Sequence, residues 1–240
     1  MKKAIIAICA ADAAFLLLLM LSGVFDGILF YAFYAISLIL PFALGILVSR
    51  DLSCNNYLHF GKREARLTLP LIPLTVFIIV IISVLTSLAL ELFGLQDNTV
   101  LEGNFFEALI SYALIPALFE ELLFRYLPLR VLSHHSPRIT VLISAALFAA
   151  VHLDPFRIFY AFVAGAILMS IDIMCESVFP SVIIHFVNNT LSVVSFFLDG
   201  YELFAPAYIS ALLAVSVFAA IYVYSRRGEY IRLFKNTLFK

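Results

Sequence analysis

Charged residues are scarce in this sequence: Asp, Glu, Lys and Arg together make up 13% of its 240 residues. A typical soluble domain carries about 25% charged residues and about 45–50% apolar residues. Here hydrophobic residues reach 64%, so a large part of the apolar surface has to face lipid. The scarcity of charge therefore argues against a soluble domain and indicates an integral membrane protein.

Cysteine and net charge are low as well. The three cysteines, Cys9, Cys54 and Cys175, match no zinc or redox spacing, which argues against a disulfide framework or thiol chemistry. A formal net charge of −1 gives no reason to expect a nucleic-acid partner. Internal repeats and low-complexity segments are also missing, so we expect a single transmembrane domain over residues 1–240.

The sequence contains long apolar runs with few charged residues. A membrane helix needs about 20 mostly apolar residues, because the hydrocarbon core is roughly 30 Å thick and a helix rises about 1.5 Å per residue. The chain holds about eight such runs, which predicts an all-α, polytopic integral membrane protein. The expected spans are residues 4–22, 28–48, 69–93, 105–127, 136–152, 156–174, 179–198 and 206–224.

The basic residues are distributed unevenly between the two sides of these spans. All but one of the 15 Lys and Arg residues lie at the two chain ends or within residues 50–66 and 125–138, and the exception is Arg157. Loops of the cytoplasmic side carry an excess of Lys and Arg. The distribution therefore predicts that both termini are cytoplasmic.

Ionisable residues inside the spans point to a site. A charged side chain at the centre of a membrane helix costs at least ~2.5–3.5 kcal/mol, so each one needs a reason. Most of these residues fall in the fourth, fifth and seventh expected spans, and we interpret Asp12, Asp172 and Glu176 as interfacial or structural. The candidate site residues are Glu120, Glu121, Arg125, His152, His185 and Asn189.

Helical spacing separates the two glutamates. Glu121 and Arg125 stand four residues apart on one face, so they can pair. Glu120 points about 100° away and has no partner on its own helix. Because desolvation makes an unpaired carboxylate a stronger base, Glu120 suits a general base that activates water. His185 and Asn189 also share a face, which sets an imidazole beside an amide donor.

If these faces converge with His152, the pocket holds what amide hydrolysis needs: a base for water and donors for the oxyanion. Each residue also has a non-catalytic interpretation. The glutamates and arginine can form an ion pair with a snorkelling end, and His152 can be interfacial. His185 and Asn189 can serve as hydrogen-bonding contacts between helices.

Three motifs stand in the order typical of the type II CAAX prenyl endopeptidases, also called CPBP intramembrane proteases, which residues 115–189 resemble: Glu120-Glu121-x-x-x-Arg125, Phe148-x-x-x-His152 and His185-x-x-x-Asn189. The first hundred residues are similar only in being transmembrane. The resemblance implies that the catalytic motifs lie within 115–189. It also implies an intramembrane peptidase activity.

By this resemblance, Glu120 and His152 activate the attacking water, and His185 and Asn189 stabilise the oxyanion. Glu121 and Arg125 hold the architecture. Two departures stand out. Family members commonly carry glycine where this chain has Tyr126. The short fifth span would also place His152 roughly 24 Å along its helix, deeper than Glu120, so tilt or an embedded start has to compensate.

The cofactor is left open between none and a divalent metal such as zinc. Proteins of this family are often described as metalloproteases, although a glutamate mechanism without metal is also proposed for them. The sequence leans against zinc, because it lacks His-Glu-x-x-His and because an asparagine amide is a poor zinc ligand. If a metal binds, the expected ligands are Glu120, His152 and His185.

The sequence thus predicts an intramembrane endopeptidase acting on a prenylated or membrane-associated peptide, with that peptide and the bilayer as partners. A first alternative is a non-catalytic scaffold or bacteriocin-immunity protein of the same fold. A second is a small secondary transporter that uses the glutamates and histidines as an ion relay, although transporters usually show repeats and broken helices, at which only Pro116 hints. The sequence does not specify an oligomeric state.

Overall fold

The computed structural model describes residues 2–22, 24, 27–50, 57–59, 62–94, 101, 103–152, 155–198 and 204–238. These residues form helices and no strand, which confirms the all-α prediction for this part of the chain. The elements are α1 (Lys2–Ser22), α2 (Gly27–Val48), α3 (Lys62–Glu91), α4 (Phe105–Ala108), η1 (Leu109–Leu114), α5 (Ile115–Glu121), η2 (Leu122–Tyr126), α6 (Leu127–Val131), α7 (Pro137–Ala150), α8 (Pro155–Cys175), α9 (Phe179–Phe197), α10 (Phe204–Ser225) and α11 (Arg227–Leu238), where η marks a π-helical segment.

Several of these helices are suited to cross a membrane. By length and composition, four long apolar segments among the described residues qualify: Ala65–Glu91, Arg157–Cys175, Phe179–Phe197 and Ala207–Ser225. Shorter apolar helices cover Ile6–Leu21, Phe33–Val48 and Pro137–Ala150. The elements from α4 to α6 follow one another without interruption over residues 105–131. The protein is therefore a helical integral membrane protein, and the count of eight spans stays a prediction.

Two boundaries differ most from the sequence prediction. Helix α3 begins at Lys62 instead of residue 69, and residues 227–238 form α11 where only a basic tail was expected. The fourth expected span also continues to Val131 instead of ending at residue 127. The polar start of α3 and α11 contact each other. Arg66 forms an ion pair with Glu229 at 2.6 Å, and the Tyr230 hydroxyl donates to the Leu67 carbonyl at 3.3 Å.

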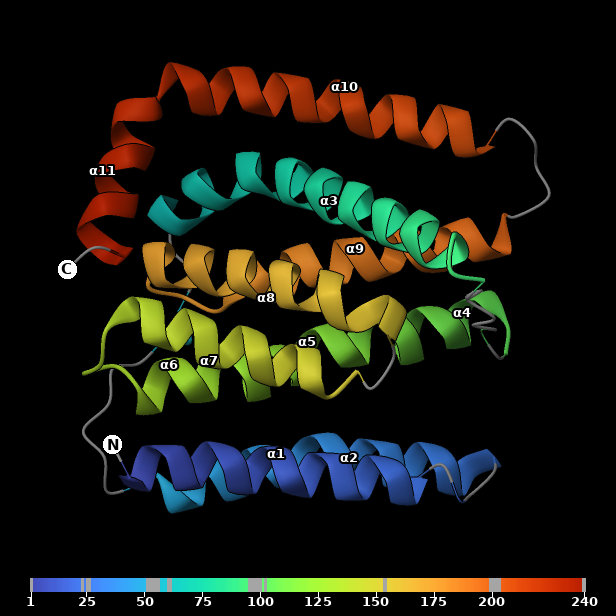
Figure 1. Ribbon diagram of the computed structural model, residues 1–240, viewed down its shortest axis with the longest axis vertical. Helices are drawn as coiled ribbons and strands as arrows, with labels where there is room; N and C mark the ends of the chain where they lie inside the picture. The colour runs from blue at the N-terminus through green and yellow to red at the C-terminus, as the bar shows by residue number, and fades with distance from the viewer. Residues whose placement is uncertain are drawn as a thin grey trace.

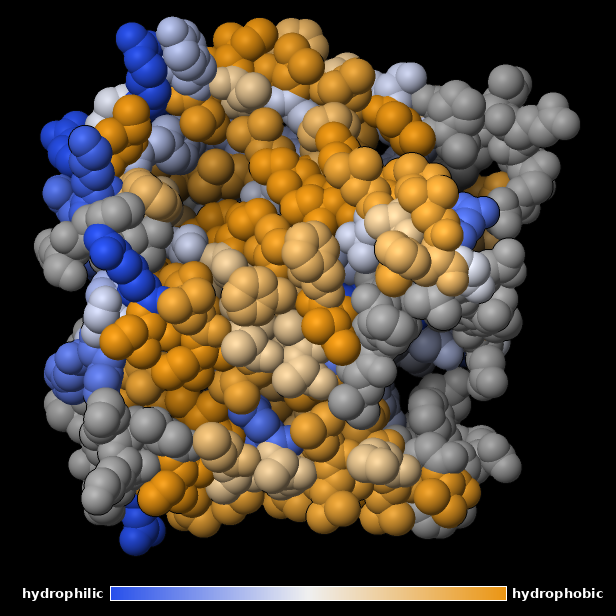
Figure 2. Space-filling view, in the orientation of Figure 1, coloured by the Kyte–Doolittle hydropathy of each residue, from blue (hydrophilic) through white to orange (hydrophobic). Residues whose placement is uncertain are grey.

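The helices lie side by side, with α1 and α2 as a hairpin at one edge and α10 at the other (Figure 1). Helix α10 packs mainly on α3, and α11 turns across the helix ends. Both termini lie at this same end of the molecule (Figure 1). Apolar residues cover the middle of the surface, while hydrophilic residues gather at the end with the termini (Figure 2).

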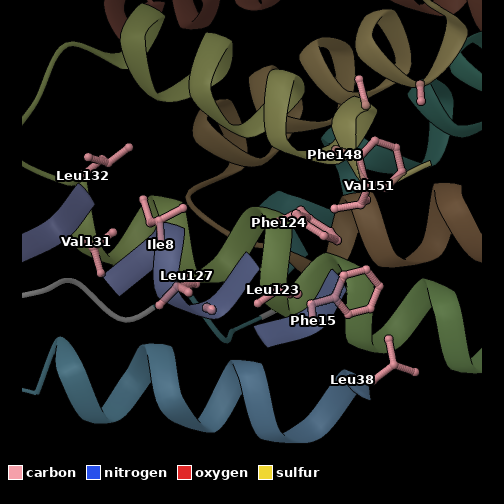
Figure 3. Close-up of a cluster of buried hydrophobic side chains, with 13 residues drawn as sticks. Ile8, Phe15, Leu38, Leu123, Phe124, Leu127, Val131, Leu132, Phe148 and Val151 are labelled. Atoms are coloured by element: carbon pink, nitrogen blue, oxygen red, sulfur yellow. The ribbon is translucent and has the colours of Figure 1, made fainter. Parts of the chain in front are cut away.

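An aromatic and aliphatic core joins the α1–α2 hairpin to the segment that follows the glutamates (Figure 3). Phe124 of η2 is its centre and is fully buried. Its ring meets Phe15 of α1 edge-on at 5.7 Å and Phe148 of α7 at 5.8 Å. Leu38 of α2 belongs to the same cluster. Burial of these side chains fixes η2 between the hairpin and α7, next to the candidate site.

Candidate active site

Two π-helical segments flank the glutamate pair, and two prolines explain them. The backbone N–H of Ile115 bonds to the Ile110 carbonyl and that of Leu127 to the Leu122 carbonyl, five residues back in each case. Pro116 and Pro128 follow directly. A proline lacks the N–H and clashes with the carbonyl four residues earlier, so a widened turn before it relieves the conflict.

The second of these turns is also held from outside. The carbonyl four residues before Pro128 is that of Phe124, and it accepts a 2.6 Å hydrogen bond from the buried Ser144 hydroxyl of α7. A backbone acceptor that lost its helical donor in an apolar core is thereby satisfied. Helix α7 is thus tied to η2 one turn away from Phe148. The glutamates lie on α5 between the two widened turns, a kind of place where functional sites are frequent.

Glu121 is the centre of a buried polar network. Its side chain is fully buried, with Oε2 3.3 Å from the Arg125 Nε and Oε1 2.7 Å from the His185 Nδ1. The helical spacing predicted the pairing with Arg125, but not the contact with His185 on α9. Because a carboxylate only accepts, the His185 Nδ1 carries the proton of this bond and the ring orientation is fixed.

The Phe148 ring brings the three motifs together. The Arg125 guanidinium carbon lies 4.0 Å from the ring centroid, in the geometry of a cation–π contact. The His152 ring packs edge-on against it at 4.8 Å, and the His185 ring at 5.9 Å. His152 was expected to lie deeper than Glu120, but it packs on the same ring as His185 and lies close enough to Glu120 for the charge of that carboxylate to act on it.

Glu120, His152 and Asn189 are half-buried. Glu120 lies close enough to His152, and to Tyr34 of α2, for its charge to act on both. His152 donates from Nδ1 to the Phe148 carbonyl at 2.7 Å, which leaves its Nε2 available. Asn189 lies one turn beyond His185, and its side-chain oxygen accepts a 3.3 Å bond from Asn188. Between described residues, no hydrogen bond joins Asn189 to Glu120 or His152.

Sequence reasoning missed the place of Asp172 and Ser181 in this site. Val178, the N-cap of α9, provides no side-chain cap, so the first N–H groups of α9 need acceptors. The fully buried Asp172 of α8 accepts a 3.0 Å bond from the Ser181 N–H, one turn before His185. The signal was present, since a carboxyl group inside an apolar span indicates a specific partner.

The expected metal ligands are not gathered into one cluster. Among the residues that the structure describes, no three His, Cys, Asp or Glu side chains are grouped so that they could hold an ion. The Nδ1 atoms of His152 and His185 are engaged with the Phe148 carbonyl and with Glu121, so Nε2 is the atom that either ring would offer to a metal or to a substrate. The choice between a metal and the side chains alone stays a prediction for experiment.

Comparison with known proteins covers the region of the site. No curated protein and no solved structure matches the chain. Residues 102–191 match the protein family described as Type II CAAX prenyl endopeptidase Rce1-like. This stretch is well under half of the chain, but it runs from the start of α4 into α9 and contains all three motifs. The resemblance predicted from the motifs is therefore confirmed over this stretch: residues 102–191 are similar to a family of CAAX-type membrane proteases.

Proposed function

We propose that this protein is an intramembrane endopeptidase of the CAAX-processing type, which hydrolyses a peptide bond in a prenylated or membrane-associated peptide. The observation that supports it most is the Phe148 ring with Arg125, His152 and His185 around it, inside the family-matched segment. Residues from η2, α7 and α9 are needed for this arrangement. A snorkelling ion pair alone would not require two histidines beside it.

In the proposed reaction, Glu120 and His152 activate water. The Nδ1–H of His152 is held by the Phe148 carbonyl, so its Nε2 faces the water as an acceptor. The Glu120 carboxylate takes a proton as the water oxygen attacks the scissile carbonyl, and the same proton passes to the leaving amine. Atoms balance with water as the second substrate, and the products are a carboxylic acid and an amine.

The oxyanion formed by this attack is stabilised by His185 and Asn189. In its imidazolium form, His185 donates Nε2–H to the oxyanion, while its Nδ1–H remains hydrogen-bonded to the Glu121 carboxylate. The Glu121 carboxylate stabilises the positive ring, as a carboxylate behind a catalytic histidine does in other hydrolases. Asn189 contributes its side-chain N–H group. Removing one such donor typically costs about 100- to 1,000-fold in turnover.

The peptide enters from the cytoplasmic side or laterally from the lipid. Both termini and most basic residues lie at one end of the helices, and the positive-inside rule makes that end cytoplasmic. Glu121 and Arg125 serve as support for His185 and Phe148. They do not react.

The test is cleavage of a farnesylated CAAX peptide and a panel of membrane peptides by the purified protein. Glu120→Gln should abolish cleavage, because an amide cannot take the proton. The matched control is Glu91→Gln, the same chemical change at the exposed end of α3, which should leave cleavage unchanged. Equal cleavage by wild type and Glu120→Gln would refute the mechanism.

A chelator arm is run on the same substrates. Unchanged cleavage in its presence fits a reaction carried by side chains, whereas loss of cleavage that returns with zinc would assign a metal. Absence of cleavage by the wild type on every substrate would favour the non-catalytic scaffold.

A further inference from the structure

Helix α11 lies where a membrane surface is expected. Helix α10 is an apolar segment that ends at Ser225, and α11 begins two residues later at Arg227. The chain turns there, so that α11 runs across the ends of α3 and α8 (Figure 1). A helix that follows directly on the end of a span, and runs across it, lies along the boundary between hydrocarbon and water.

One face of α11 is fixed to the body of the protein. Tyr230 is buried and donates to the Leu67 carbonyl at 3.3 Å, and Leu233 packs in the same apolar cluster as Cys175. Burial raises the pKa of the Tyr230 phenol to about 12, so this donor stays protonated at physiological pH. Glu229 pairs with Arg66 at 2.6 Å. Helix α11 is therefore a docked element of the fold.

A second face of α11 exposes apolar side chains. Ile231 is 50% exposed and Phe234 is 43% exposed. They stand three residues apart, so they lie on one face of the helix. Together they form a small apolar patch next to exposed basic side chains. At the acyl boundary of a bilayer the same two side chains are stabilised.

Apart from Asn236, the remaining exposed side chains in the described part of α11 are basic. Arg227, Arg232 and Lys235 are exposed, and Arg232 also lines a shallow groove with Gly228 and Asn236. Glu229 is the acidic residue of α11, and its carboxylate is already engaged by Arg66 and by Arg226. The unneutralised charge of this face is therefore positive, which complements phosphate groups.

We propose that α11 is an interfacial helix that binds the anionic lipids of the leaflet at this end of the protein. Ile231 and Phe234 enter the boundary between headgroups and acyl chains, and Arg232 and Lys235 bind the lipid phosphates. A second copy of the chain is a poorer occupant, because a symmetric contact would set Arg232 and Lys235 against their own copies.

The absence of tryptophan makes the test direct. The sequence contains no Trp, so Phe234→Trp in the full-length protein creates a single emitter at the proposed contact. The variant is reconstituted in phosphatidylcholine vesicles and in vesicles with a quarter of phosphatidylglycerol, each lipid brominated in turn near its headgroup. The matched control is Asn236→Trp, at an exposed position on the opposite side of the helix.

The expected result is strong quenching of emission from the Phe234→Trp variant and weaker quenching from the Asn236→Trp variant, whose Trp would lie beside Arg232 on the opposite face. Each basic residue near a membrane surface contributes about 1 kcal/mol towards anionic lipid, so Arg232 and Lys235 should give phosphatidylglycerol a preference on the order of tenfold or more. Arg232→Gln with Lys235→Gln should remove that preference. Arg232→Lys with Lys235→Arg should retain it and shows that the loss is due to charge.

Three outcomes overturn the proposal. Unquenched emission from the Phe234→Trp variant means that the face is in water. Equal quenching by both lipids, unchanged by the Gln variants, means that the contact is apolar only. Shielded emission that depends on protein density in the vesicle, with no quenching by lipid, assigns the face to a second copy of the chain.

Discussion

The buried pair Glu121–Arg125 gives the sharpest quantitative prediction. Both side chains are fully buried, and the Arg125 Nε lies 3.3 Å from the Glu121 Oε2. At an effective dielectric constant of about 20, two unit charges at this separation attract each other by about 5 kcal/mol. Removing one partner leaves the other charge uncompensated inside the protein, which costs about 3–5 kcal/mol.

The perturbation is a double-mutant cycle. Arg125→Met should lower the free energy of unfolding by about 3–5 kcal/mol, because Glu121 loses its buried counter-charge and keeps only neutral or partly charged hydrogen-bond donors such as His185. Glu121→Gln should cost less, since the Gln carbonyl still accepts from His185 and Arg125 keeps its contact with Phe148. The double variant should lose less than the sum of the single losses, with a coupling of about 1–3 kcal/mol.

The assay is unfolding in mixed micelles by increasing sodium dodecyl sulfate, followed by circular dichroism. The control cycle uses Arg66→Met and Glu229→Gln, whose charges pair at 2.6 Å but whose side chains are 49% and 24% exposed. An exposed pair contributes at most about 1 kcal/mol. Additive losses at Glu121 and Arg125, or a coupling no larger than in the control cycle, would refute the reasoning.

Three further changes follow from the structure, all measured by the same unfolding assay. Asp12 is 7% exposed in α1, and its carboxylate oxygens have no hydrogen-bond partner among the described residues. Asp12→Leu should therefore stabilise the protein by about 1–3 kcal/mol, and a loss of stability would reveal a partner of Asp12. Glu176 has a φ of 54°, so Glu176→Gly should gain up to about 1 kcal/mol, and Glu176→Val should lose stability; the reverse order contradicts the conformational argument. A Cβ at Gly165 would lie 3.2 Å from the Ala145 backbone and 3.3 Å from the Phe148 ring. Gly165→Ala should therefore lower the free energy of unfolding by about 1–3 kcal/mol and reduce peptide cleavage by displacing Phe148. Unchanged stability and cleavage would mean that α7 and α8 adjust freely.

Most of the fold could be predicted from apolar run length alone. Runs of this length fix where helices form, because in lipid each backbone group has to be bonded within its own segment. The start of α3 and the whole of α11 could not be read this way. The two segments contact each other through Arg66 with Glu229 and Tyr230 with Leu67, and contacts between residues this far apart in sequence leave no local pattern.

Contacts of the candidate site within one helix could be predicted from the sequence, and contacts between helices could not. The spacing of Glu121 and Arg125 predicts their pairing, because both lie on one helical face. The contact of Glu121 with His185 depends on how two helices are rotated against each other, which no periodicity records. Phe148 belonged to a motif, but its role as a shared ring for three helices required the packing of α7. Asp172 was interpreted as interfacial or structural, and its bond to Ser181 was not foreseen.

The π-helical turns on either side of α5 have a consequence for rotational register. Each of them accommodates one more residue than an α-helical turn does. Deleting one residue within 109–114 can therefore convert η1 to an α-helical turn while α4 and the two glutamates keep their orientation. A deletion inside α5 has no extra residue to remove, so it would rotate one side of the helix by about 100° relative to the other. The helix thus tolerates changes in length on both sides of the glutamates, while the pair itself has to remain adjacent and in phase.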